Sequence, residues 1–266
     1  MHTIEDLVGS LQLEPIGDNR YRAGNLPVAH GVVFGGQLMG QSIVAALLGQ
    51  EGKTVKTLHT VFARAGSTEA PVEIVVEPVH SGRTLSSTTV TIQQGDRICT
   101  KSSVLLSADD DDLIRHADPA PTVAGPDASV AAPDVHGDWE IRVVDGVDIS
   151  DPDAVGPPVL DVWTRFVGAP DEPAVDQALV AFATDGFLIG AAMRPHAGVG
   201  QSQAHVTLST GVGGSLVSIG TAAGVALMGL VRNHYTFLNH LRWAWAIALG
   251  YVASILTHLW INAALM

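Results

Sequence analysis

The stretch VFGGQLMGQSIVAALLG, residues 33–49, joins two adjacent glycines to a long apolar segment. Between residues 37 and 48 the apolar side chains recur every three or four positions, which predicts a helix. These side chains are Met39, Ile43, Val44 and Leu47. The opposite side carries uncharged residues, so we expect the helix to be mostly buried, with Gly49 as its C-terminal cap.

Four strands are predicted after this helix, at residues 55–64, 72–79, 84–93 and 97–107. The segment Gln94-Gly95-Asp96 predicts a hairpin turn between the last two. Before the helix, residues 11–24 predict an extended segment that a turn at residues 17–19 interrupts. A helix followed by an antiparallel meander predicts an α+β fold in which the sheet wraps the helix.

The same order of elements begins again in the second half of the chain but does not finish. Residues 109–138 are acidic and rich in proline, which predicts a solvated linker. Extended segments at 139–146 and 158–168 precede a predicted helix at 174–189, and no meander follows residues 205–208. We therefore expect four parts, namely 1–108, the linker 109–138, an incomplete second unit at 139–210 and a tail at 211–266.

Charge and cysteine content restrict the class of partner and the compartment. The net charge is −13, and all 27 acidic residues lie within the first 185 positions. An acidic protein repels polyphosphate at long range, so nucleic acid is not an expected partner. A single cysteine, Cys99, excludes an intrachain disulfide framework, and the amino terminus lacks a signal-peptide pattern. Both features predict a cytoplasmic location for the acidic part.

Two long uncharged stretches, 212–231 and 243–266, form most of the tail. As helices they would reach roughly 30 and 36 Å, enough to cross a hydrocarbon core of about 30 Å. We predict a hydrophobic helical hairpin, with membrane insertion better supported for the second stretch, because glycines interrupt the first. A membrane partner through 212–266 and a homo-oligomer are both kept as options.

Several motifs resemble those of type II acyl-CoA thioesterases. They are Val33–Gln37, Leu58–Gly66, Ala181–Asp185 and Ala192–His196. The resemblance extends over residues 1 to about 210 and implies a double hotdog, in which each of two units has a long helix wrapped by an antiparallel sheet. It also implies hydrolysis of a fatty acyl-CoA to a free fatty acid and coenzyme A, without a metal or redox cofactor.

Asp185 is the predicted catalytic residue. It follows the apolar run 178–184, where an unpaired carboxylate would be costly to bury unless it were paired or functional. Thioester hydrolysis needs a carboxylate that accepts a proton from the attacking water and donors for the oxyanion. By resemblance Asp185 corresponds to the water-activating aspartate of the family; the alternative is an aspartate that faces solvent beside Gly186.

The predicted substrate-binding residues are Gly35, Gly36, Gln37, His59 and Arg64. The two glycines would let a thioester oxygen approach the first amides of the helix, although they would equally allow close packing of that helix. Arg64 could offset the phosphate charge of coenzyme A, and the alternative is a solvated arginine. His59 is predicted to lie in a strand, where a structural role is the alternative.

The chain departs from the family pattern near residue 210. The resemblance implies that a hydroxyl residue and a late glutamine help the aspartate to hold the water. Ser202 is the candidate for the hydroxyl, and no glutamine occurs after Gln203. Loss of one member of a coupled catalytic group removes much of its rate advantage, so we expect impaired activity. The alternatives are a membrane-anchored acyl-CoA-binding module without turnover and a non-functional gene fusion.

The last 55 or so residues resemble the C-terminal end of a sodium/proton antiporter of the ion-transporter superfamily. The residues that carry this resemblance are 213–229, 241–243 and 247–255. Two helices alone cannot enclose a transport pathway, so we do not predict transport. A fused or rearranged gene product would account for both resemblances.

Overall fold

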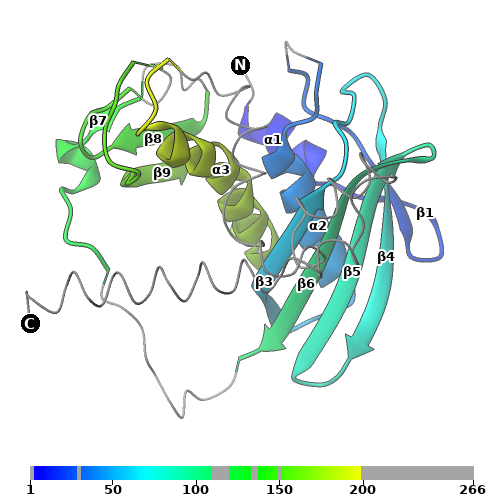
Figure 1. Ribbon diagram of the computed structural model, residues 1–266. Helices are drawn as coiled ribbons and strands as arrows, with labels where there is room; N and C mark the ends of the chain where they lie inside the picture. The colour runs from blue at the N-terminus through cyan, green and yellow to red at the C-terminus, as the bar shows by residue number, and fades with distance from the viewer. Residues whose placement is uncertain are drawn as a thin grey trace, which may run out of the picture. The chain divides into compact units, whose positions relative to one another are not determined.

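The six-stranded antiparallel sheet of the first half wraps helix α2 (Gly35–Leu47) in this computed structural model (Figure 1). The structure describes residues 3–28, 31–109, 120–132, 137–148, 151 and 153–198. The strands are β1 (Glu14–Gly17), β2 (Arg20–Ala23), β3 (Lys53–Phe62), β4 (Val72–Ser81), β5 (Leu85–Gln94) and β6 (Arg97–Ala108). Their order in the sheet is β1-β2-β4-β5-β6-β3. The predicted α+β fold, with a sheet around the first helix, is confirmed.

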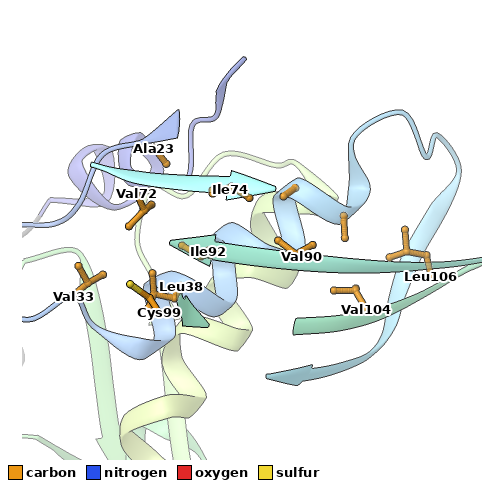
Figure 2. Close-up of a cluster of buried hydrophobic side chains, with 12 residues drawn as sticks. Ala23, Val33, Leu38, Val72, Ile74, Val90, Ile92, Cys99, Val104 and Leu106 are labelled. Atoms are coloured by element: carbon orange, nitrogen blue, oxygen red, sulfur yellow. The ribbon is translucent and has the colours of Figure 1, made fainter. Parts of the chain in front are cut away.

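Alternation along β5 and β6, two interior strands of the sheet, explains why one face of the sheet is buried. In β6 the buried side chains recur at every second position from Thr100 to Leu106. In β5 the even-numbered positions Ser86, Thr88, Val90 and Ile92 are buried. This period of two places one face of the sheet against α2. Figure 2 shows side chains of this core, including Leu38 of α2 and Ile74, Val90, Ile92 and Val104 of the sheet.

Helix α2 is buried on more than one side, as we predicted. Ile43 packs in a second core, with Leu7 and Leu11 from the amino-terminal segment and Leu179 from a later helix. The uncharged side that we placed opposite the apolar stripe is also buried, and Gln41, Ser42 and Ala45 are at most 1% exposed. The helix begins two residues earlier than we expected, because the two glycines already belong to it.

The amino-terminal segment contains one element that was not predicted. A short helix, α1 (Ile4–Ser10), precedes the first strand and was not predicted. Its capping box joins Thr3 and Asp6: the Thr3 amide donates a hydrogen bond to the Asp6 side chain, and the Asp6 amide donates one to the Thr3 hydroxyl. The predicted extended segment at 11–24, interrupted by a turn, is confirmed as the two paired strands β1 and β2, and Asn19 takes a positive φ of 53° at the turn between them.

The second half begins inside the stretch that we predicted as a linker. Residues 109–138 include the 3-10 helix η1 (Pro126–Ala128) and strand β7 (Val130–Ala131), which pairs with β8 (Trp139–Val143). Strand β9 (Val162–Phe166) completes a three-stranded sheet of order β7-β8-β9. The end of the predicted linker is therefore part of the second sheet, because its backbone hydrogen-bonds to β8.

Helix α3 (Pro173–Met193) follows this sheet and lies beside α2 (Figure 1). Proline at its first position suits a helix start, since the amide there has no partner within the helix. By length and composition α3 could cross a membrane, yet a third of its most apolar window is buried within the protein. A core helix of a globular protein has the same properties. The predicted tail helices and the strand at 205–208 lie outside the described residues.

Candidate active site

The close contact between α2 and α3 depends on glycines of α2. A Cβ atom built on Gly36 would lie 2.4 Å from the carbonyl oxygen of Phe182, and one on Gly40 would lie 3.3 Å from that of Ala178. These pairs are four residues apart on each helix and therefore lie along one face. The absent side chains let the two backbones approach, so the first turn of α2 meets the middle of α3.

Because α2 and α3 lie this close to each other, the carboxylate of Asp185 on α3 reaches the first turn of α2. Its Oδ2 atom accepts a hydrogen bond from the Gly36 amide at 3.0 Å. The N-cap residue of α2 is Phe34, which has an extended backbone and supplies no side-chain cap. Asp185 therefore does for α2 what an N-cap side chain ordinarily does, although it comes from another helix. A negative charge there also complements the positive end of the helix dipole.

Aromatic rings surround this contact on the side of α3. The ring of Phe182 lies 4.9 Å from that of Phe34, and 5.5 Å from that of Trp139 in β8. Trp139 in turn stacks on Phe166 of β9 at 5.4 Å. These rings join the second sheet to the start of α2 and place apolar groups near the contact between Asp185 and Gly36. Hydrogen bonds to a carboxylate are stronger in such surroundings than in water.

The loop that precedes α2 is fixed by the segment after β3. The Val33 amide donates to the Gly66 carbonyl at 2.9 Å, and the Thr68 amide donates to that of Gly31 at 3.1 Å. The amides of Ala63 and Arg64 donate to the Cys99 carbonyl in β6. Two of the motifs that resemble the thioesterases therefore lie against each other, and together they set where α2 begins.

The structure brings Asp185, Gly35 and Gly36 together, but it does not bring Gln37 to them. Gln37 has no measurable exposure, and its Oε1 accepts a hydrogen bond from the Leu26 amide at 2.9 Å. Its Nε2 donates to the Gly24 carbonyl and to Asn25. The side chain of Gln37 thus anchors the segment that leads from the first sheet strands toward α2.

The remaining predicted residues lie on or after β3. His59 is exposed and pairs with Ser103 across the sheet, and Arg64 is exposed just beyond the strand. Within the described ranges no acidic side chain forms an ion pair with Arg64. Ser202, the candidate hydroxyl partner, lies outside the described residues. Among the residues that are described, no cluster of three or more His, Cys, Asp or Glu could hold a metal ion.

Sequence reasoning missed Phe62 at this site. Its ring atom Cε1 would lie 2.9 Å from a Cβ on Gly35, and Oδ2 of Asp185 would lie 2.7 Å from the same point. Phe62 is 44% exposed although it is a large apolar residue at the end of an edge strand. The only signal in the sequence was its place within the motif Leu58–Gly66, which does not show what the ring faces.

Comparison with known proteins supports a thioesterase-type fold. Residues 24–107 match the family model of the acyl-CoA thioesterase N-terminal domain. Acyl-coenzyme A thioesterase 8 of Mus musculus is 28% identical over 218 residues, which cover 70% of this chain and 67% of that protein. The TesB protein of Mycobacterium avium subspecies paratuberculosis superposes with a TM-score of 0.58 at 25% identity, over 69% of each chain.

A second group of relatives is unrelated to thioesterases. The Na(+)/H(+) antiporter NhaD of Halomonas elongata is 49% identical over 102 residues, which cover 38% of this chain and 19% of the antiporter. Across four such antiporters the chain spans 11 to 20% of their length. The comparisons do not support our placing of this resemblance in the last 55 residues.

The solved thioesterase structures share the α+β fold with antiparallel sheets that is described above. The chain therefore carries an acyl-CoA thioesterase N-terminal domain, at residues 24–107, within a hotdog fold of the thioesterase type.

Proposed function

We propose that this protein is an acyl-CoA thioesterase-like hydrolase, which cleaves a fatty acyl-CoA to a free fatty acid and coenzyme A. The observation that carries the proposal is the 3.0 Å hydrogen bond from the Gly36 amide to Oδ2 of Asp185. It places a carboxylate at the start of a helix, among aromatic rings, where both a base and backbone donors for an oxyanion are needed.

The reaction that we propose uses water as the nucleophile. A water molecule beside Asp185 attacks the thioester carbonyl carbon while the carboxylate accepts one of its protons. The carbonyl oxygen becomes an oxyanion, the carbon–sulfur bond then breaks, and the departing thiolate takes up the proton. The products are the fatty acid and the free thiol of coenzyme A.

The oxyanion donor in this proposal is the Gly35 amide. We expected both glycine amides to serve, but the Gly36 amide already donates to Asp185. No described residue accepts a hydrogen bond from the Gly35 amide, and it lies in the first turn of α2, where amides have no partner within the helix. A donor fixed before the reaction stabilises the oxyanion without reorganisation.

The coenzyme A part of the substrate is proposed to lie along the exposed end of β3. Arg64 and His59 are both solvent-accessible there, and Arg64 can offset the negative charge of phosphate groups. Gln37 acts indirectly in this proposal, because its buried amide fixes the chain before α2 and not the ligand. A cytoplasmic location and a membrane attachment through residues 212–266 remain further proposals.

Hydrolysis and binding without turnover give different products, so isotope labelling tests the proposal. The full-length protein is incubated with a series of fatty acyl-CoA substrates in water enriched in oxygen-18. We expect free fatty acid that carries one atom of oxygen-18, together with an equal amount of free coenzyme A. Acyl-CoA that is bound in calorimetry but recovered intact would reject the hydrolase in favour of a binding module, and neither binding nor turnover would reject both.

A further inference from the structure

Gly35 and Phe62 lie next to the carboxylate of Asp185, which accepts a hydrogen bond from the Gly36 amide. We infer that these two residues position Asp185 for catalysis: the missing side chain of Gly35 leaves the space that the carboxylate occupies, and the ring of Phe62 closes that space. The inference deepens the proposed function and rests on it.

The space beside Gly35 is just large enough for the carboxylate. A Cβ atom at this residue would meet Oδ2 of Asp185 at 2.7 Å and two ring atoms of Phe62 at 2.9 and 3.2 Å. Contacts below about 3.0 Å do not persist, so a methyl group would displace at least one of these side chains. No backbone atom is among the three nearest, so the displacement would fall on the side chains.

The position of Phe62 is set by the sheet and not by a hydrophobic core. It is the last residue of β3 and pairs with Thr100, and the next amide, that of Ala63, donates to the Cys99 carbonyl at 2.8 Å. The ring belongs to neither buried core cluster and is 44% exposed. An exposed ring adds little to stability through burial, so its contact with the Gly35–Asp185 pair is the interaction that defines it.

The effect of this enclosure is electrostatic and geometric. A ring above the pair excludes water from one side, which strengthens the hydrogen bond between Asp185 and the Gly36 amide. It also limits the directions in which the carboxylate can point. A base that is displaced by about 1 Å can lose roughly 100-fold in rate, so the effect should appear in kcat and not in substrate affinity.

Kinetics of matched glycine variants test the positioning role. Gly35→Ala should lower kcat by roughly 10- to 100-fold and leave KM unchanged. The double variant Gly35→Ala with Phe62→Leu should recover part of the lost kcat, because the shorter side chain gives the methyl group room. Gly186→Ala is the control: it is adjacent to Asp185 on α3, and a Cβ there would meet nothing within 4 Å. It should keep the wild-type kcat.

Amide hydrogen exchange provides a readout that does not need turnover. Glycine is labelled with carbon-13 at its carbonyl and with nitrogen-15 at its amide. A peptide bond then carries both labels only between two glycines, and an NMR experiment that requires both labels detects only such bonds. The chain has two, at residues 35–36 and 213–214. Gly214→Ala removes the second signal and so assigns that of Gly36. We expect the Gly36 amide to be protected in the wild type and in Gly186→Ala, and to exchange faster in Phe62→Leu and in Asp185→Ala.

Each result decides one of the two proposals. If the wild type hydrolyses acyl-CoA but Gly35→Ala keeps its kcat, or loses it without any recovery in the double variant, the positioning role is overturned. Unchanged Gly36 protection in Phe62→Leu would overturn it as well. If the exchange pattern holds but the wild type hydrolyses nothing, the proposed function fails while the enclosure of the carboxylate is supported.

Discussion

Cys99, the single cysteine of the chain, shows how strongly burial controls one side chain. It lies in β6 with no measurable exposure, among the core residues drawn in Figure 2. Burial raises the pKa of the Cys99 thiol, and the smaller opposing effects of the Arg97 charge and a hydrogen bond with the Gln94 backbone do not cancel it. The thiol therefore stays neutral and inaccessible in the native protein.

We predict that Cys99 does not react with a disulfide reagent such as Ellman's reagent at pH 8 while the protein is folded. Reaction needs the thiolate and access to it, and burial removes both. One equivalent should react after unfolding in guanidinium, which is the control. Rapid labelling of the native protein would contradict the burial of Cys99. The predicted inertness also means that this reagent can report free coenzyme A without a background from the protein.

Asp185 and the adjacent Gly35 and Gly36 could be singled out from the sequence, but the contacts of Gln37 and Phe62 could not. Asp185 follows an apolar helical run, and a carboxylate in such a place indicates either a partner or a function. Gln37 and Phe62 gave no comparable signal. Their roles depend on residues far away in the sequence, such as Leu26 for Gln37 and Gly35 for Phe62. A pattern within one segment does not contain that information.

Among the elements, helices α2 and α3 approach each other closely at Gly36 and Gly40. We predict that Gly36→Ala lowers the free energy of unfolding by roughly 1–3 kcal/mol, since its Cβ would lie 2.4 Å from a carbonyl oxygen and 2.5 Å from the Phe34 ring. Gly9→Ala in α1 is the control, because a Cβ there meets nothing within 4 Å. Urea unfolding measures both. Equal stability of the two variants would contradict the close approach.

The end of α3 is held by an ion pair whose effect should depend on pH. Nη2 of Arg194 lies 2.6 Å from Oδ2 of Asp145, and the Arg194 side chain is only 10% exposed. Arg194 also donates to the Val159 carbonyl, and its own carbonyl accepts from the Gly156 amide at 2.8 Å. One arginine thus fixes the loop between β8 and β9 to α3.

This pairing lowers the pKa of Asp145. Partial burial alone would raise that pKa, but the hydrogen bonds from Arg194 and the Val147 amide, together with the Arg194 charge, outweigh the burial. A carboxyl with a lowered pKa stabilises the folded state above its ordinary pKa of about 3.9. That contribution disappears as the pH falls through the pKa of the folded state.

We therefore predict that Asp145→Asn lowers the melting temperature at pH 7 by about 1–4 °C, as expected for a partly exposed ion pair. The difference from the wild type should shrink as the pH falls toward 3, because the wild-type carboxyl becomes protonated and neutral. Thermal unfolding followed by circular dichroism between pH 7 and pH 3 measures this. A difference that stays constant with pH would contradict the role of the charge.

At the scale of the whole molecule, the sequence predicted the order of elements and not their contacts. Strands β3 to β6 were predicted within one or two residues of their ends, because two-residue alternation is a local property. Strand β7 was missed, since two residues in a polar stretch form a strand only through pairing with β8. The domain boundaries at 108, 138 and 210 stay predictions.

The two halves also differ in how much sheet surrounds each helix. In the described part of the chain, α2 has a six-stranded sheet and α3 a three-stranded one. Val180 and Leu188 of α3 remain 65% and 71% exposed. The incomplete second unit at 139–210 stays a prediction, because its last residues lie outside the described part of the chain. Whether such a molecule still hydrolyses a thioester is the central question.

The most direct measurement is the rate of coenzyme A release from a fatty acyl-CoA by the full-length protein and by Asp185→Asn. The variant keeps the size of the side chain and an oxygen that can accept from the Gly36 amide, but it removes the base. We predict measurable release by the wild type and a loss of roughly 100-fold or more in the variant. Equal rates for the two proteins, or no release by either, would contradict the account.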